Sequence, residues 1–257
     1  MHLVKLGGSA ITDKRDYKTL KGEILRRLAG ELTASGQELM VVHGAGSFGH
    51  ILAKRHRLHL GFERREQVSG MAQVMTDVRE LNLQVLRTMI QEGTPSVSIP
   101  PSSAAEMENG ELISLALDVF ERYLTLGVTP ITFGDVCLDR EKHFGICSGD
   151  QLMEILAQRF RPESIVFCTD VDGVFTCHPM EEDARLLRSV DRDLLDDLPR
   201  ADTVDDVTGG IHGKLECMLR MSHFTDRCLV VNGLEPGRLE AALKGEEVKG
   251  SRIIGGG

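Results

Sequence analysis

The chain has 257 residues, of which 41% are hydrophobic and 27% are charged. This composition excludes an intrinsically disordered protein, and a chain of this length buries enough surface to fold without disulfides or a structural metal. The formal net charge of −9 excludes a broad nucleic-acid-binding surface, which needs a basic face. The apolar runs are only a few residues long, well short of the ~20 residues that span a bilayer.

Short apolar runs rich in β-branched residues alternate with amphipathic segments along the chain. The runs predict buried strands at residues 3–6, 39–43, 96–99, 128–133, 165–169 and 228–232. The amphipathic segments predict helices at residues 20–33, 71–90, 112–124 and 151–159, and Gly36 is expected to end the first of them. This alternation is typical of an α/β fold with a mostly parallel sheet covered by helices on both faces.

Residues 181–206 interrupt the alternation, since they hold ten acidic residues and four arginines. We expect a solvated, partly helical excursion there; a mobile flap over a nucleotide is the alternative. No linker rich in proline, glycine or serine divides the chain. The sequence therefore predicts a single domain over residues 1–257, with two lobes that meet near residues 150–165.

The six cysteines include no CxxC pair, which argues against a zinc site and a thioredoxin-like motif. The first residues lead directly into an apolar run and Gly7, without the charged and long apolar regions of a secretion signal. We therefore expect reduced cysteines and a cytoplasmic protein.

Glycine crowds the loops that follow the predicted strands, which is where ligands bind in open α/β sheets. The first strand ends in KLGGS, residues 5–9, where Gly7 and Gly8 allow a backbone to approach a phosphate. Lys5 alternates with core-facing residues, so its ammonium is awkward there unless it meets an anion. Lys14 follows a short distance along the chain. An ordinary strand-to-helix turn is the alternative for the glycines, and a surface lysine is the alternative for Lys14.

The second strand runs into HGAGSFGH, whose glycines at 44, 46 and 49 formally satisfy GxGxxG. A dinucleotide site is not supported, because this is the second strand–helix turn. The acidic ribose partner is also expected at the end of the next strand, about 20 residues on, where this sequence runs through the basic stretches 54–57 and 64–65. A glycine loop that leads into a helix N-terminus remains a good anion cradle. His50 falls at that helix start, where a surface or capping histidine is the alternative interpretation.

Two further loops carry carboxylates. In GICSGD, Ser148 or Asp150 could cap the helix that follows, and a ligand site is the other possibility. In TDVDGV, Asp170 and Asp172 could bind Mg²⁺ or contact a nucleotide, and an Asx turn closed by Gly173 is the alternative.

The fifth loop is TGGIHGK, residues 208–214. Its end is similar to a Walker A motif, but Thr208 replaces the leading glycine and Leu215 replaces the final serine or threonine. A P-loop NTPase is therefore not supported. Two glycines ahead of Lys214 at a helix start still suit a phosphate site.

Together, KLGGS, GAGSFGH, GICSGD, TDVDGV and TGGIHGK resemble the amino acid kinase superfamily, in that family's order and over nearly the whole chain. The histidine that closes GAGSFGH, with KLGGSAITDK and FGD, looks most like the isopentenyl phosphate kinase family. A fosfomycin kinase is similar in this loop and remains a rival.

The resemblance implies an αβα sandwich with a mostly parallel central sheet, the amino acid kinase fold, and a homodimer. It implies ATP and Mg²⁺, and conversion of isopentenyl phosphate to isopentenyl diphosphate in the alternative mevalonate route of isoprenoid biosynthesis. The N-terminal lobe, about residues 1–160, would bind the acceptor, and the C-terminal lobe, about residues 161–257, would bind the nucleotide. Small-molecule substrates are the expected partners, with no nucleic acid and no membrane.

The resemblance also implies roles for individual residues. The catalytic group would be His50, Lys5, Lys14, Lys214 and Asp150. The acceptor site would comprise Ala45, Gly46, Gly49, His50, Ser148 and Gly149. The nucleotide site would comprise Lys5, Gly7, Gly8, Ser9, Gly46, Asp170, Asp172, Gly173, Gly209 and Lys214. The lysines would contact the donor phosphates, His50 the acceptor phosphate, and Asp150 would orient a lysine; no protein metal site is predicted.

The residue types suit this chemistry. A phosphate monoester has a second pKa near ~6, so it is largely dianionic at neutral pH and attacks without a general base. Its site needs cations and fixed donors that neutralise two repelling phosphates, rather than a catalytic carboxylate. Met71, Val74, Met75 and Val78 share one helix face; core packing is expected for at least half of them, and the others could contact a hydrocarbon tail. A kinase of another phosphate or phosphonate, or a non-catalytic nucleotide-binding protein, are the alternatives.

Overall fold

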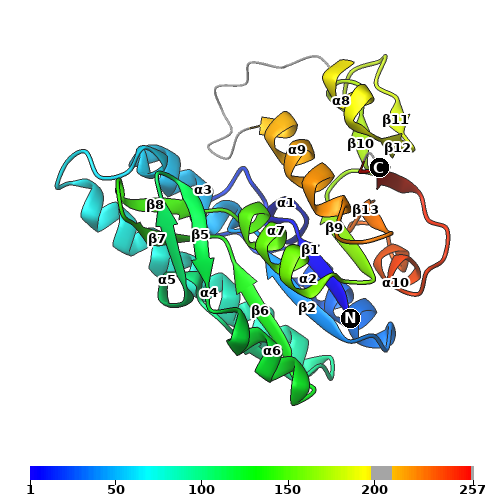
Figure 1. The fold of residues 1–257 in the computed structure, drawn as a ribbon, viewed down its shortest axis with the longest axis horizontal. Coiled ribbons are helices and arrows are strands. Elements are labelled where there is room, and N and C mark those ends of the chain that lie inside the picture. The colour runs from blue at the N-terminus through cyan, green and yellow to red at the C-terminus, as the bar shows by residue number, and fades with distance from the viewer. Residues whose placement is uncertain (198–209, 256–257) are drawn as a thin grey trace.

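The computed structural model describes residues 1–197 and 210–255, and a large, mostly parallel sheet runs through its centre (Figure 1). Every neighbouring pair in this sheet is parallel except β13 with β14, which is antiparallel. In spatial order its strands are β12 (Ser189–Val190), β14 (Gly250–Ile253), β13 (Cys228–Asn232), β9 (Ser164–Thr169), β1 (His2–Leu6), β2 (Leu39–His43), β6 (Thr129–Phe133) and β3 (Ser96–Ser98). All six strands predicted from the sequence are present.

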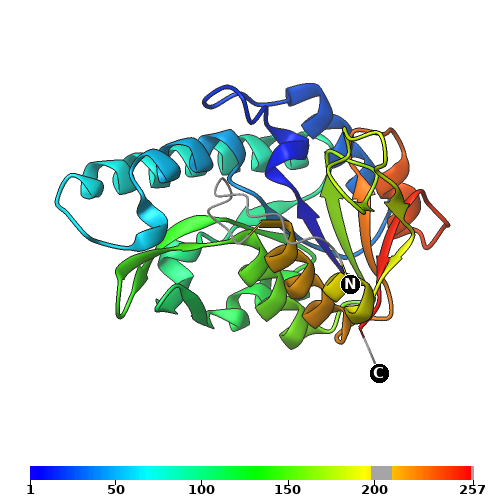
Figure 2. The ribbon, with the colours of Figure 1, turned by 90° about the horizontal axis from the view of Figure 1, so that it is seen from above.

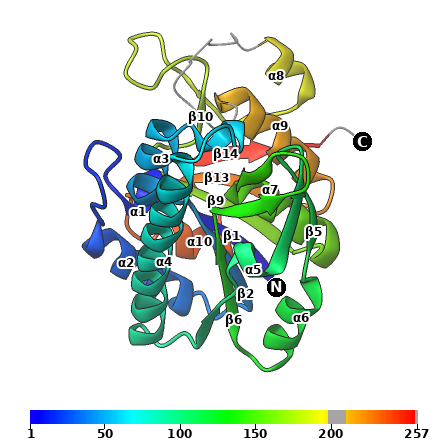
Figure 3. The ribbon, with the colours of Figure 1, turned by 90° about the vertical axis from the view of Figure 1, so that its left-hand side faces the viewer.

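Helices cover both faces of the large sheet (Figure 3). One face packs against α1 (Gly8–Ile11), α2 (Gly22–Ala34), α3 (Gly46–Arg55), α4 (Gln67–Gln91) and α10 (Arg238–Leu243). The other packs against α6 (Leu117–Thr125), α7 (Gly149–Phe160), α8 (Arg192–Asp197) and α9 (Gly210–Ser222). The predicted αβα sandwich is therefore confirmed.

The alternation of side chains along β1 shows how the two layers form. Leu3 contributes to the core on the α7 side, whereas Val4 and Leu6 contribute to the core on the α2 side. All three are at most 1% exposed. A strand buried on both faces must be apolar at successive positions, which is why these strands read as continuous hydrophobic runs.

A second sheet of four strands projects beyond the edge of the large one. Its order is β5 (Glu111–Leu115), β4 (Ala105–Glu108), β7 (Asp135–Asp139) and β8 (His143–Cys147). In Figure 2 its hairpins lie on the same side of the molecule as α3 and the start of α4. The remaining short elements are α5 (Pro101–Ala104), the 3₁₀ helix η1 (Leu58–Leu60), β10 (Val174–Phe175) and β11 (Leu186–Leu187).

The predicted helix at residues 112–124 is wrong in its first third, because residues up to Leu115 form β5. Asn109 and Gly110 have φ values of 52° and 90°, and Glu108 pairs with Glu111 across them. This is a two-residue hairpin, for which Asn-Gly is a strong signal because both positions need positive φ. The spacing of the apolar residues after the turn fits both the helical period of about 3.6 and the strand period of about 2. The hairpin turn selects the strand.

The acidic segment at residues 181–206 contains helix α8 and the strands β11 and β12, which agrees with a partly helical excursion. Its residues 198–206 lie outside the described residues, as do Thr208 and Gly209. Among the helices that the structure describes, none combines the length and the apolar character needed to cross a membrane.

Candidate functional site

One cavity collects most of the residues that the sequence analysis selected, and we call it the glycine-loop cavity. It lies at the carboxyl ends of β1, β2 and β9, beside the N-terminal ends of α3 and α7. This is the edge at which open parallel sheets bind ligands. The selected residues that line it are Lys5, Gly7, Gly8, Ser9, Lys14, Ala45, Gly46, Gly49, His50, Ser148, Gly149, Asp150 and Lys214.

The first two glycine loops touch each other at the floor of this cavity. A Cβ atom added to Gly8 would lie 2.6 Å from Cα of Gly46. Gly46 itself has φ of +51°, and its added Cβ would lie 2.1 Å from Oγ1 of Thr12. Side chains at either position would push the loops apart, so the close approach of two backbones requires glycine at both.

Two helices begin at the glycine-loop cavity. Helix α3 begins at Gly46 and helix α7 begins at Gly149. Ser148 caps α7: its Oγ accepts a hydrogen bond from N of Gln151 at 3.2 Å, and the Gln151 side chain accepts from N of Ser148 at 3.3 Å. The capping interpretation is thus confirmed for Ser148. Helix N-termini present unpaired N–H groups and a positive end of the helix dipole, so both favour an anion in the cavity.

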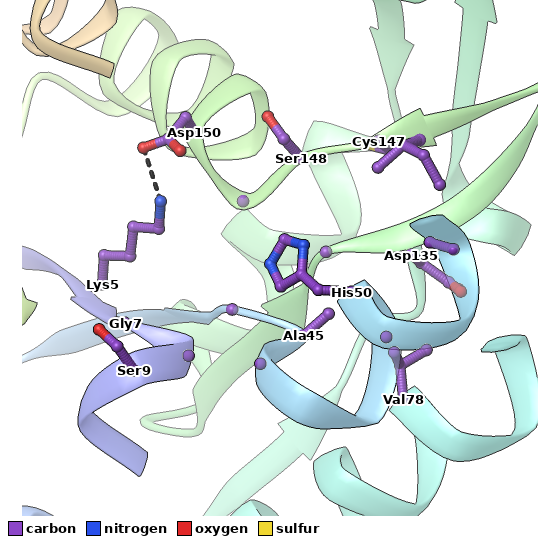
Figure 4. Close-up of a pocket in the computed structure, with 18 of the residues that line it drawn as sticks. Lys5, Gly7, Ser9, Ala45, His50, Val78, Asp135, Cys147, Ser148 and Asp150 are labelled. Carbon is purple, nitrogen blue, oxygen red and sulfur yellow. Dashed lines mark hydrogen bonds and ion pairs between the residues drawn. The ribbon is translucent and has the colours of Figure 1, made fainter. Parts of the chain in front are cut away.

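Lys5 is held in place by Asp150 (Figure 4). Nζ of Lys5 donates to Oδ1 of Asp150 at 2.6 Å, and the side chains are 13% and 12% exposed. Nζ also lies 5.9 Å from the centre of the Phe167 ring. The ammonium group therefore sits at the cavity wall in a fixed orientation, joining β1 to the first turn of α7.

His50 enters the cavity from the first turns of α3. Figure 4 shows its imidazole beyond the Lys5–Asp150 pair, with Ala45 and Ser148 beside it. Lys14, from the loop after α1, and Lys214, from α9, line the same cavity. Four cationic or hydrogen-bonding side chains from four separate segments thus meet at one place, although the chain as a whole carries a net charge of −9.

One end of the cavity is apolar. Val74 and Val78 of helix α4 line it and also belong to the neighbouring core cluster, against which Met71 and Met75 pack. All four residues of the helix face selected from the sequence therefore take part in core packing, and two of them also line the cavity. The other apolar side chains that line this end are Ala53, Val136 and Ile146.

Sequence reasoning missed part of the lining. Gly134 and Asp135 directly follow β6, so the rule that selected the other strand-end loops would have found them. The remaining lining comes mostly from β7 and β8, which were not predicted, from the end of β9 and from α9. These residues are Ala53, Val136, Ile146, Cys147, Phe167, Cys168, Thr169 and Met218.

Asp135 is a buried carboxylate in the cavity wall. Its side chain is fully buried, Oδ1 accepts from N of Val136 at 2.9 Å, and Oδ2 lies 3.5 Å from Nη2 of Arg79. Burial raises the pKa of Asp135, and the Arg79 guanidinium opposes that rise. The carboxylate joins the start of β7 to helix α4 at the apolar end of the cavity.

The carboxylates of TDVDGV lie outside this lining. Asp170 accepts a hydrogen bond from Oγ of Ser9 at 2.6 Å. Asp172 accepts from Lys249 and Arg238, both at 2.6 Å, and from Nδ2 of Asn232 at 3.1 Å. The hydrogen bond from Lys249 is the largest cause of a pKa of Asp172 well below its usual range.

Gly173, in the same loop, packs against the backbone and side chain of Ser251 on β14, where an added Cβ would lie 2.4 Å from Oγ. Gly209, the remaining predicted nucleotide residue, lies outside the described residues. Among residues 1–197 and 210–255, no three or more His, Cys, Asp or Glu side chains come together as metal ligands.

Comparison with known proteins identifies one family and a group of similar kinases. The family model described as "Amino acid kinase family" matches residues 1–232. An isopentenyl phosphate kinase of Methanothermobacter thermautotrophicus is 38% identical, and the alignment covers 99% of each chain. One of Thermoplasma acidophilum is 35% identical over 93% of this chain and 94% of its own. A solved structure described as "X-ray structures of isopentenyl phosphate kinase" has a TM-score of 0.86 at 35% identity, covering 99% of this chain and 100% of that chain.

Proposed function

Because the chain belongs to the amino acid kinase family, we propose that it transfers the γ-phosphoryl group of ATP to isopentenyl phosphate. The products are isopentenyl diphosphate and ADP, and the reaction is a step of isoprenoid biosynthesis. The chain is thus a phosphotransferase with a phosphate group as its acceptor. Relatives that carry this name match it over nearly their entire length, which supports the proposal.

The observation that carries the proposal is the composition of the glycine-loop cavity. It combines His50 with three lysines and two helix N-termini, and it continues into an apolar end. Two phosphorylated molecules repel each other strongly, and fixed cations in a partly enclosed site offset that repulsion. The apolar end suits an acceptor that carries a hydrocarbon tail, which distinguishes isopentenyl phosphate from a small phosphonate.

The transfer needs no general base. An oxygen of the acceptor phosphate is already deprotonated at neutral pH, since a monoester's second pKa is near ~6. It forms the new bond to the γ-phosphorus of ATP. The bond from that phosphorus to the β,γ-bridging oxygen breaks, and ADP leaves with the electron pair. Charge builds on the oxygens of a loose transition state, where fixed cations stabilise it most.

We assign the residue roles on this basis. His50 binds the acceptor phosphate, and Ala45, Gly46, Gly49, Ser148 and Gly149 line its site. Lys5, Lys14 and Lys214 contact the donor phosphates, and Asp150 orients Lys5 through the 2.6 Å ion pair. On the nucleotide side we propose Gly7, Gly8, Ser9 and Gly46 at the phosphates, with Asp170, Asp172, Gly173 and Gly209 in the loops beside them.

We propose that Mg²⁺ accompanies ATP. The described residues hold no cluster of three or more candidate metal ligands. They fit an ion that is carried on the nucleotide, because Mg²⁺ keeps several waters and is commonly held through substrate phosphates. When bound, the ion supplies positive charge to the phosphates.

We propose that the hydrocarbon tail of the acceptor lies against Val74 and Val78. Both side chains are at most 3% exposed, and both line the cavity. Burying one CH₂ group of the tail there contributes about 0.8 kcal/mol, so a five-carbon tail adds usefully to binding. Asp135 and Arg79 close this end by linking β7 to α4.

The wider organisation follows the family resemblance. We propose an acceptor-binding lobe at about residues 1–160, a nucleotide-binding lobe at about residues 161–257, a cytoplasmic location and a homodimer. Exposed Leu83 and Ile90 on the outer side of α4, 44% and 57% exposed, offer apolar surface to a second copy. Sedimentation equilibrium tests the dimer, and a mass of 28.3 kDa would reject it.

An ADP-release assay with a panel of acceptors tests the function. Purified protein receives ATP, Mg²⁺ and one of isopentenyl phosphate, dimethylallyl phosphate or fosfomycin. We expect the highest kcat/KM with isopentenyl phosphate and a product that mass spectrometry identifies as the diphosphate. Faster turnover of fosfomycin would identify a phosphonate kinase, and ATP binding without turnover of any acceptor would identify a non-catalytic nucleotide-binding protein.

A further inference from the structure

His43, the last residue of β2, lies directly before the second glycine loop and is fully buried. Its ring stacks on Phe133 of β6, with centres 5.1 Å apart and planes 14° apart. Its Nδ1 lies 3.0 Å from the carbonyl oxygen of Gly44, and its Nε2 lies 3.1 Å from Nδ2 of Asn82. The Asn82 side chain reaches onward to Ser98 on β3, whose Oγ lies 2.6 Å from Oδ1 of Asn82.

The carbonyl of Gly44 decides where the proton of this ring sits. A carbonyl oxygen only accepts, so Nδ1 of His43 must carry the hydrogen and donate. The neutral ring then has an acceptor at Nε2, which requires the NH₂ group of Asn82 to face it. Oδ1 of Asn82 is left to accept from the Ser98 hydroxyl. The side chains of Ser98, Asn82 and His43 and the Gly44 carbonyl thus form one continuous series of hydrogen bonds.

The same contact fixes the peptide group between Gly44 and Ala45. No cis peptide bond occurs among residues 1–197 and 210–255, so the carbonyl and the N–H of this group point in opposite directions. Since the carbonyl points at the buried ring, the N–H of Ala45 points away from that ring, and both residues line the glycine-loop cavity. On the adjoining backbone, N of Gly44 donates to the Leu6 carbonyl at 2.9 Å.

We propose that His43 is a positioning residue, held as the Nδ1–H tautomer by Asn82 and Ser98, that aims the Ala45 N–H at the acceptor phosphate. It touches no substrate and acts only through the Gly44–Ala45 peptide group. Asn82 lies on α4 and Ser98 on β3, so the acceptor loop is aligned from the helix and the sheet edge beside it.

The surroundings of the ring support a permanently neutral imidazole. Burial lowers the pKa of His43 to about 4, against a smaller rise from the hydrogen bond to Gly44. The ring therefore stays uncharged at neutral pH and keeps one donor and one acceptor. An apolar residue would fill the same space against Phe133, but it would leave the Gly44 carbonyl and the Asn82 amide unpaired, which is costly for buried groups.

Two substitutions of His43 test its two hydrogen bonds separately, the one donated to the Gly44 carbonyl and the one with the Asn82 amide. In His43→Asn, the side-chain NH₂ group takes the position of Nδ1 and still donates to Gly44. In His43→Gln, the amide reaches the position of Nε2, keeps the contact with Asn82 and offers no donor to Gly44. Both shorten or reshape the same buried side chain, so each is the control for the other.

The kinetic test rests on the proposed function. We expect His43→Gln to raise KM for isopentenyl phosphate about tenfold or more, and His43→Asn to raise it no more than about threefold, with little change in KM for ATP. An equal rise in both variants would overturn the proposal. Should the wild type fail to phosphorylate isopentenyl phosphate, the proposed function falls, and the tautomer measurement below still decides the inference.

The tautomer is measured without any turnover. In protein labelled with ¹⁵N-histidine, we expect the His43 signals to show a protonated Nδ1 and an unprotonated Nε2 at neutral pH. The opposite tautomer would overturn the proposal directly. Ser98→Ala, with Ser96→Ala on the same strand as its control, is a milder variant that leaves the buried ring in place. It frees the Asn82 amide to rotate and offer Oδ1 to Nε2 of His43, which then competes with the Gly44 carbonyl for the ring proton. We expect mixed tautomers only in Ser98→Ala; unchanged signals there would show that Ser98 does not help to hold the tautomer and would overturn that part of the proposal.

Discussion

The loops at the ends of β2 and β9 contain similar residues and use them differently. At the end of β2, glycines let two backbones meet, and the adjoining polar groups line the glycine-loop cavity. At the end of β9, the carboxylate of Asp172 is held by Lys249, Arg238 and Asn232, and Gly173 packs on Ser251. Both loops have the pattern of ligand-binding loops in the sequence. The first presents its glycines and His50 to the cavity, whereas the second lines the cavity with Thr169 and turns Asp172 and Gly173 to other segments.

The difference shows that a polar side chain after a strand has two possible uses. It can face a ligand, or it can fix the loop by pairing with neighbouring segments. Asp172 has three donors from β13, α10 and the segment before β14, so its charge is already balanced within the protein. Lys5 also has a partner, Asp150, yet that pair stays in the cavity wall. Substitutions on the two sides should therefore change different quantities.

Removing the histidine on the acceptor side should have the largest effect. In His50→Ala, we expect kcat/KM for isopentenyl phosphate to fall about 100- to 1000-fold, the usual loss when one fixed donor to a reacting group is removed. The thermal midpoint should change little, because His50 is exposed in the cavity. Steady-state kinetics and a melting curve measure both quantities.

His178→Ala is the matched control, since that histidine is exposed and lies outside the cavity lining. We expect unchanged kinetics from it. If His50→Ala kept near wild-type kcat/KM, the acceptor phosphate would have no assigned side-chain ligand and the comparison between the two loops would fail.

The Lys5–Asp150 pair should show the next largest effect and a distinctive pattern. We expect Lys5→Met to lower kcat about 100-fold and Asp150→Asn about tenfold, because the lysine stabilises the transition state and the carboxylate only orients it. The double variant should then be no slower than Lys5→Met, since groups that act as a unit are not additive. Independent, multiplying losses would show that Asp150 has a role of its own. Lys244→Met, which removes a surface pair on α10, is the control.

On the nucleotide side, Asp172→Asn should change stability more than catalysis. We expect the free energy of unfolding at neutral pH to fall by about 1.5–3 kcal/mol, the range for hydrogen bonds to a charged group. Urea unfolding measures it, and exposed Asp118→Asn on α6 is the control. A large rise in KM for ATP without loss of stability would instead place Asp172 at the nucleotide, and the two loops would then be alike.

The loss of unfolding free energy in Asp172→Asn should depend on pH in a predictable direction. The Lys249 hydrogen bond lowers the pKa of Asp172 in the folded protein, whereas an unfolded aspartate titrates near ~3.9. A lowered folded pKa stabilises the protein above the unfolded value, and this contribution disappears as the pH falls towards the folded value. The difference between wild type and Asp172→Asn should therefore be full at neutral pH and narrow below about pH 4.

The large sheet could be predicted from the sequence because its strands are buried on both faces. Residues 39–42, for example, are apolar in succession and all are buried in β2. The small sheet could not, because β5 is mostly exposed and its apolar spacing also fits a helix. The one local signal was Asn109–Gly110, a turn pair whose meaning depends on the strands beside it.

The cavity residues that belong to a sequence motif could be predicted. Those that come from distant strands could not, because only the topology of the fold brings them together. KLGGS and GAGSFGH identified both glycine loops, and the family resemblance that they carry is confirmed. Val136 and Ile146 come from β7 and β8, so no local pattern could bring them to Val78. The partners of Asp172 lie 60 or more residues away in the chain, and only the folded sheet shows that they balance its charge.

The smallest effect should come from the contact that holds α9 on α7. Arg220 of α9 donates to both carboxylate oxygens of Glu154 on α7, at 2.6 and 2.8 Å, six residues after Lys214. Arg220 is 51% exposed, so solvent screening limits the pair to about 1 kcal/mol or less. Arg159→Ala is the control, because Arg159 is similarly exposed, at 48%, and joins α7 to α6 through Glu121. We expect both variants to melt slightly earlier and only Arg220→Ala to lower kcat, by about two- to fivefold, because a small loosening of α9 displaces Lys214. Equal kcat in the two variants would show that α9 is held by its buried residues, such as Leu215, and that its surface pair does not align the lysine.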